Sequence, residues 1–98
     1  MHKEILVIDD NPDIRSLVSS ILKEQNFEVR TAANYDQAVF EIKKKLPDLA
    51  IIDIKLDKTD KDGIDLLKLI TQKDKLIPVI MISGHATVQI AVEATRLG

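Results

Sequence analysis

The chain has 98 residues, of which 45% are hydrophobic and 31% are charged, a composition typical of one soluble globular domain. Fourteen basic and sixteen acidic side chains leave a net charge of −2. The chain therefore has no overall basic field that would attract nucleic acids or anionic membranes. The absence of cysteine excludes disulfides and thiolate metal sites, and no apolar run approaches the ~20 residues that cross a bilayer, so we expect a single cytoplasmic domain over residues 1–98.

The first half of the chain alternates a strand pattern with a helix pattern twice. Residues 5–8 form a continuous apolar run, which is typical of a strand buried on both faces. Asn11 can cap a helix that begins with a proline and continues to about residue 25. Residues 27–31 alternate as a strand does, and a helix ended by Pro47 follows. The expected apolar faces of these two helices contain Ile14, Leu17, Val18, Ile21 and Leu22 in the first, and Tyr35, Ala38, Val39, Ile42 and Leu46 in the second.

The second half of the chain repeats this alternation. Residues 49–52 form a third apolar run, and a polar, turn-prone stretch over 55–63 separates it from a helix over 64–73. Residues 78–82 form a fourth apolar run, after which helical spacing resumes and predicts a last helix that ends near Leu97.

Successive strand–helix units predict an α/β fold, with a parallel sheet covered by helices on both faces. If the strand order is 2-1-3-4, the first and third strands are neighbours at the point where the order reverses. Asp9 and Asp10 follow the first strand, Asp53 follows the third, and Ser83 follows the fourth. Because the carboxyl ends of parallel strands meet at one edge of the sheet, we expect these side chains to share one crevice.

The three carboxylates of this crevice predict a cation between them. Two unit charges about 4 Å apart repel by roughly 4 kcal/mol at an effective dielectric constant of about 20. No cysteine or histidine lies near these strand ends, so the donors are hard oxygens, which suit Mg²⁺. An aspartate beside such an ion can act as a nucleophile toward phosphorus, and Asp53, at the tip of a central strand, is best placed to do so.

Three stretches of the chain resemble the receiver domain of bacterial two-component response regulators. Residues 5–11 are similar to the first strand and acidic pair of that family, 49–56 to its third strand and phosphoacceptor loop, and 78–86 to its fourth strand and switch hydroxyl. Asp62 and Gly63 match the pair before the third helix, so the resemblance covers essentially the whole chain. It implies a flavodoxin-like (CheY-like) doubly wound sheet of order 2-1-3-4 that lacks the usual fifth strand–helix unit.

The resemblance also implies the roles of the site residues. Asp10 and Asp53 would ligate Mg²⁺ directly, Asp9 largely through water, and Lys55 through its backbone carbonyl. Asp53 would accept a phosphoryl group from a sensor histidine kinase, and the hydroxyl of Ser83 would act as the switch. Such a domain supports its own phosphorylation and dephosphorylation, but it is not a conventional turnover enzyme.

The last part of the chain is most similar to receivers of the nitrogen-regulation class, through the stretch from Ser83 to Thr87 and through residues 90–92 and 96–98. That class implies an output outside this chain, with an ATPase that acts on an alternative sigma factor and a DNA-binding domain. We therefore expect the whole protein to regulate transcription.

The sequence departs from the family pattern in two places. The loop between Asp53 and Gly63 is longer than in most members, and Asp57 stands where a proline is common. The sequence also stops at Gly98, before the family's fifth strand, which carries a lysine that pairs with the phosphoryl group. We therefore expect a truncated receiver that self-associates through its fourth strand.

Two other functions remain open. A degenerate receiver would bind partners without phosphorylation, although its usual mark, the loss of an acidic residue, is absent. A phosphohydrolase of the haloacid-dehalogenase type also uses a nucleophilic aspartate at a strand end, but it needs a second acid where this chain has Lys55. Taken singly, Asp9 and Asp10 would be read as helix-capping residues and Ser83 as a turn residue, so the site prediction depends on their combination.

Overall fold

The structure, a computed structural model, describes residues 3–53 and 62–82. Strands and helices alternate along the chain as the sequence predicts. They are β1 (Glu4–Ile8), α1 (Pro12–Glu24), β2 (Glu28–Ala32), α2 (Tyr35–Lys44), β3 (Leu49–Asp53), α3 (Asp62–Lys73) and β4 (Val79–Ile82). The predicted helix ending near Leu97 lies outside the described residues.

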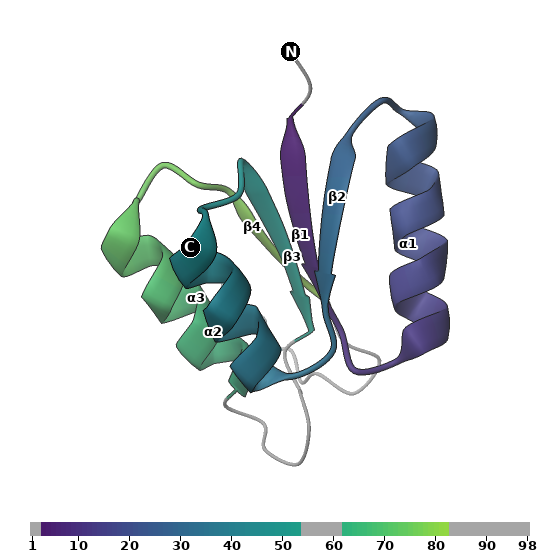
Figure 1. Cartoon of the computed structure of the whole chain (residues 1–98). Coiled ribbons are helices and arrows are strands. Elements are labelled where there is room, and N and C mark those ends of the chain that lie inside the picture. The colour runs from purple at the N-terminus through teal and green to yellow at the C-terminus, as the bar shows by residue number, and fades with distance from the viewer. Residues whose placement is uncertain (1–2, 54–61, 83–98) are drawn as a thin grey trace.

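The four strands form one parallel sheet in the order β2-β1-β3-β4, which confirms the predicted α/β topology. Figure 1 shows α1 on one face of this sheet and α2 with α3 on the other. β1 and β3 lie side by side at the centre, with Ile8 paired to Ile52 near their carboxyl ends. The residues that follow these two strands therefore emerge next to each other.

The main core lies between the sheet and the pair of helices α2 and α3. It consists of Leu6, Ile8, Ala32, Ala38, Ile42, Ala50, Ile52, Leu66 and Ile70. The apolar run of β1 is buried along its length, as expected for a central strand, because Leu6 and Ile8 face this core while Ile5 and Val7 point to the opposite face. This packing gives the carboxyl edge of the sheet a rigid base.

Asparagine side chains cap the N-terminal ends of the first two helices. The Asn11 side-chain oxygen accepts hydrogen bonds from the amides of Asp13 and Ile14, at 2.9 and 3.3 Å. Asn34 does the same for α2, accepting from the Gln37 amide at 2.8 Å. Both caps satisfy amides that have no partner inside the helix, and the first one sets the turn that carries Asp10.

The structure corrects two details of the sequence prediction. α2 ends at Lys44, so Leu46 lies beyond the helix; a proline at 47 disfavours helical backbone in the residue before it. Leu17 and Ile21, predicted to lie on the buried face of α1, are 57% and 52% exposed. α1 packs on β1 and β2 over only part of its apolar stripe.

Among the helices of residues 3–53 and 62–82, none is long and apolar enough to cross a membrane.

Candidate functional site

Three carboxylates meet at the carboxyl edge of the sheet. Asp9 and Asp10 follow β1, and Asp53 is the last residue of the neighbouring strand β3. One carboxylate oxygen from each of these residues lies within 4.8 Å of the others. The convergence expected from the strand order is therefore present.

Asp9 is the buried member of this cluster, only 5% exposed. Its side-chain oxygen Oδ1 accepts a hydrogen bond from the Asn11 amide at 2.9 Å, and its own amide donates to the Ala32 carbonyl at 3.1 Å. The Asp9 carbonyl accepts a 2.7 Å bond from Nη1 of Arg15. These bonds hold the turn between β1 and α1 in one conformation.

Burial raises the pKa of the Asp9 carboxyl above its usual value of 3.8, because the charged form loses solvation. The Asn11 amide lowers this pKa, the Asp10 carboxylate raises it, and the Arg15 guanidinium lowers it, and burial is the largest of these effects. The ionised form of Asp9 is thus destabilised by the fold, and a cation that reached the cluster would relieve that cost.

Asp10 is exposed and Asp53 is half-buried, so the cluster opens to solvent on the side of these two residues. The Arg15 guanidinium acts on Asp9 and already donates to a backbone carbonyl. The donor set consists of hard oxygens in an anionic crevice. It fits Mg²⁺, which binds one or two carboxylates and keeps waters or a phosphate oxygen as its remaining ligands.

The structure places some predicted site residues and not others. Asp9, Asp10 and Asp53 are brought together, whereas Lys55 and Ser83 lie outside the described residues, as does Asp57 of the long loop.

Sequence reasoning missed one residue of the site, Arg15. The helix dipole disfavours a cation in the first turn of a helix. An arginine in that position, shortly after an acidic pair, could therefore have indicated a specific interaction with the site. Its hydrogen bond to the Asp9 carbonyl explains that position.

Comparisons with known proteins agree with this geometry. A family model described as "Response regulator receiver domain" matches residues 5–98. The nitrogen assimilation regulatory protein NtrX of Azorhizobium caulinodans is 41% identical over 98 residues, which is 100% of this chain and 22% of that protein. The chain thus spans about a fifth of the length of this curated relative.

Two solved structures extend the comparison. The crystal structure of NtrX from Brucella abortus superposes with a TM-score of 0.89 at 43% identity, covering 100% of this chain and 22% of that one. The beryllofluoride-activated NtrC4 receiver domain dimer gives a TM-score of 0.85 at 32% identity, covering 97% and 77%. The fold, the order of the motifs and the family model lead to one conclusion: this chain belongs to the receiver domain family of two-component response regulators.

Proposed function

We propose that residues 1–98 form a receiver domain that accepts a phosphoryl group on Asp53 from a sensor histidine kinase. The observation that carries this proposal is the meeting of Asp9, Asp10 and Asp53 within 4.8 Å at the end of the two central strands. The phosphoryl state would then control a transcription-regulating output.

Mg²⁺ is the ion we propose for the cluster, and when bound it would neutralise charge on the phosphoryl oxygens. Asp10 and Asp53 would be its direct ligands, and Asp9 would act on it largely through water. The graded exposure of the three supports this division, since Asp9 is buried and Asp10 is exposed. The backbone carbonyl of Lys55 is proposed as the remaining protein ligand.

Asp53 is the nucleophile in this proposal. One of its carboxylate oxygens forms a bond to phosphorus while the bond from phosphorus to the donor breaks, and the donor keeps that electron pair. The donor is a phosphorylated histidine of the kinase, whose imidazole leaves and takes up a proton. Asp9 is a poorer candidate, because its side chain is buried and accepts the Asn11 amide bond. The proposed role of Ser83 is to bond a phosphoryl oxygen and so transmit the change.

A degenerate receiver is less well supported, because all three acidic residues are present and converge. The domain serves as substrate and catalyst of its own phosphorylation, so we do not propose a turnover enzyme.

Its proposed partners are the kinase, an output region outside these residues and a second receiver, since the related NtrC4 receiver is described as a dimer. Family membership also leads us to propose a cytoplasmic protein.

The test is phosphorylation by a small acyl-phosphate donor in the presence of Mg²⁺, followed by mass spectrometry of the intact chain and of its peptides. We expect one phosphoryl group on the peptide that contains Asp53 and none in Asp53→Asn. Asp65→Asn changes an exposed carboxylate on α3 and should label normally. Metal-independent labelling, or a label on another residue, would overturn the assignment.

A further inference from the structure

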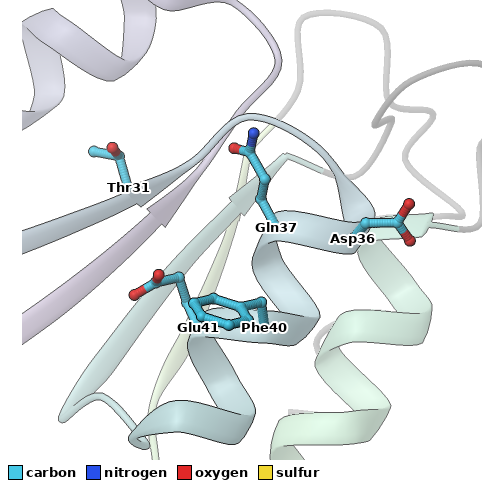
Figure 2. A pocket seen from close by; sticks show the side chains of 5 residues that line it. All are labelled: Thr31, Asp36, Gln37, Phe40 and Glu41. Carbon is cyan, nitrogen blue, oxygen red and sulfur yellow. The ribbon is translucent and has the colours of Figure 1, made fainter.

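A second hollow lies between β2 and α2. It is an open groove of about 310 Å³ lined by Thr31, Asp36, Gln37, Phe40 and Glu41. Figure 2 shows these side chains, with Thr31 on the strand and the other four on the first turns of α2. The proposed phosphorylation site uses none of these residues.

One wall of the groove is the outer edge of the sheet. β2 pairs with β1 on one side, and among the described residues no strand lies on its other side. The Glu28 amide donates to Lys3 and the Ala32 carbonyl accepts from Asp9, so these residues direct their backbone groups toward β1. Along a strand in a parallel sheet, the backbone amide and carbonyl groups of successive residues point alternately to the two sides. Those of Val29 and Thr31 therefore point away from β1, toward the open edge. Such an edge can pair with an extended segment of another chain.

The opposite wall presents an aromatic ring. Phe40 is 64% exposed, although it lies in a helix whose buried face contains Ala38 and Ile42. It is not part of that core, and its ring lines the groove. A large apolar side chain kept in solvent next to an open strand edge offers a ready anchor for a partner.

The carboxylates around the groove indicate which kind of partner it would bind. Asp36 is exposed, one helical turn before Phe40, and makes no ion pair among the described residues. Glu41 pairs with Arg30 through Oε1 at 2.8 Å, but Arg30 also pairs with Glu4 at 2.9 Å, so one cation is shared by two carboxylates. Two of the five residues that line the groove are carboxylates and none of the five is cationic, which favours a cationic side chain on the aromatic ring.

Gln37 adds a donor to this groove. Its side-chain oxygen Oε1 accepts from the Ala33 amide at 2.8 Å, which directs the NH₂ group away from that bond. An amide donor, two carboxylates and a strand edge together match the backbone and side chain of a peptide. They offer little to a small apolar ligand.

We propose that this groove binds an extended, basic segment of a partner protein. The segment pairs with the outer edge of β2 and lays an arginine or lysine side chain on Phe40, between Asp36 and Glu41. A second copy of this chain fits less well, because the cationic residue of its own β2, Arg30, is already engaged by Glu4 and Glu41. This inference is independent of phosphorylation at Asp53.

The experiment titrates the isotope-labelled 98-residue chain with a short capped peptide in which arginine alternates with threonine, followed by NMR. We expect saturable amide shifts at Val29, Thr31 and the first turns of α2. A matched peptide with glutamine in place of arginine should bind more weakly, and one N-methylated on its pairing edge should lose the shifts at Val29 and Thr31. Equal binding of all three peptides would overturn the proposal.

Variants separate the groove from general attraction of a basic peptide. Phe40→Ala should weaken binding by about two- to fivefold, the range of an exposed cation–aromatic contact. Asp36→Asn should weaken it as well, whereas Ile21→Ala, which truncates an exposed apolar residue of α1, should not. Asp10→Asn should also leave it unchanged. Loss of binding in Asp10→Asn with none in Phe40→Ala would place the peptide at the acidic crevice and overturn the proposal.

Self-association is the remaining outcome to exclude. If the shifts at Val29 and Thr31 appear on concentrating the chain without peptide, and sedimentation shows a dimer that Phe40→Ala dissociates, the occupant is a second copy. That result would overturn the assignment to a basic partner.

Discussion

Arg15, in the first turn of α1, donates a 2.7 Å hydrogen bond from Nη1 to the backbone carbonyl of Asp9. The bond joins the start of a helix to the end of the central strand β1, across the turn that carries Asp10. It also places a guanidinium near the Asp9 carboxyl, and the positive charge lowers the pKa of that group. Arg15 is therefore a positioning residue for the acidic cluster.

Replacing Arg15 should destabilise the metal-free domain. Arg15→Met removes a charge-assisted hydrogen bond and the counter-charge, and we expect the free energy of unfolding to fall by about 1–2 kcal/mol, since the residue is half-buried. Arg15→Lys keeps the charge and should lose less. Urea denaturation in the presence of chelator measures both, and equal stability of all three proteins would contradict this role.

The stability of the metal-free domain should fall as Asp9 ionises. Its pKa is raised in the fold, so the folded state binds a proton more tightly than the unfolded state, and this contribution is lost as pH rises from about 3.8 through the raised pKa. Asp9→Asn keeps the oxygen that accepts from Asn11 and should be more stable than the wild type near neutral pH, but not at low pH. Urea melts at several pH values test this, and a less stable variant at neutral pH in chelator would refute it.

Mg²⁺ should raise the stability of the domain by mass action. An ion present at about a hundred times its dissociation constant adds about 2.7 kcal/mol to the free energy of unfolding. Asp10→Asn and Asp53→Asn should each weaken this effect, because each removes a proposed ligand, and Asp65→Asn should not. Thermal melts across a Mg²⁺ titration give the comparison. A stabilisation that survives in Asp10→Asn would argue for a different site.

The 98-residue chain should self-associate through β4. This strand pairs with β3 on one side, no strand covers its other edge among residues 3–53 and 62–82, and Ile80 is 48% exposed. Contact between two such edges would bury Ile80, so Ile80→Lys should raise the dimer dissociation constant by about tenfold or more. Sedimentation velocity at several concentrations is the measurement, with Leu76→Ala, an 88% exposed residue in a loop, as the control. A monomeric wild type would show that this expectation is wrong.

The sequence by itself determined the topology and the acidic cluster. The apolar run at 5–8 predicts a strand buried on both faces, and successive strand–helix units predict a parallel sheet. Because parallel strands end at a common edge, the sequence predicts that Asp9, Asp10 and Asp53 lie at the same edge of the sheet. Local periodicity and chain direction place these residues at one edge of the sheet, and the strand order 2-1-3-4, implied by the resemblance to receiver domains, makes the first and third strands neighbours.

Only the tertiary structure decided which side chains are covered and which groups reach each other. Helical spacing assigned Leu17 and Ile21 to an apolar face, but what packs on that face depends on elements far away in the chain, and both side chains are half-exposed. The unequal burial of Asp9 and Asp10, neighbours in sequence, follows from the packing around the end of β1. The bond from Arg15 to Asp9 and the groove beside Phe40 likewise arise from contacts between separate elements, which periodicity along one element cannot encode.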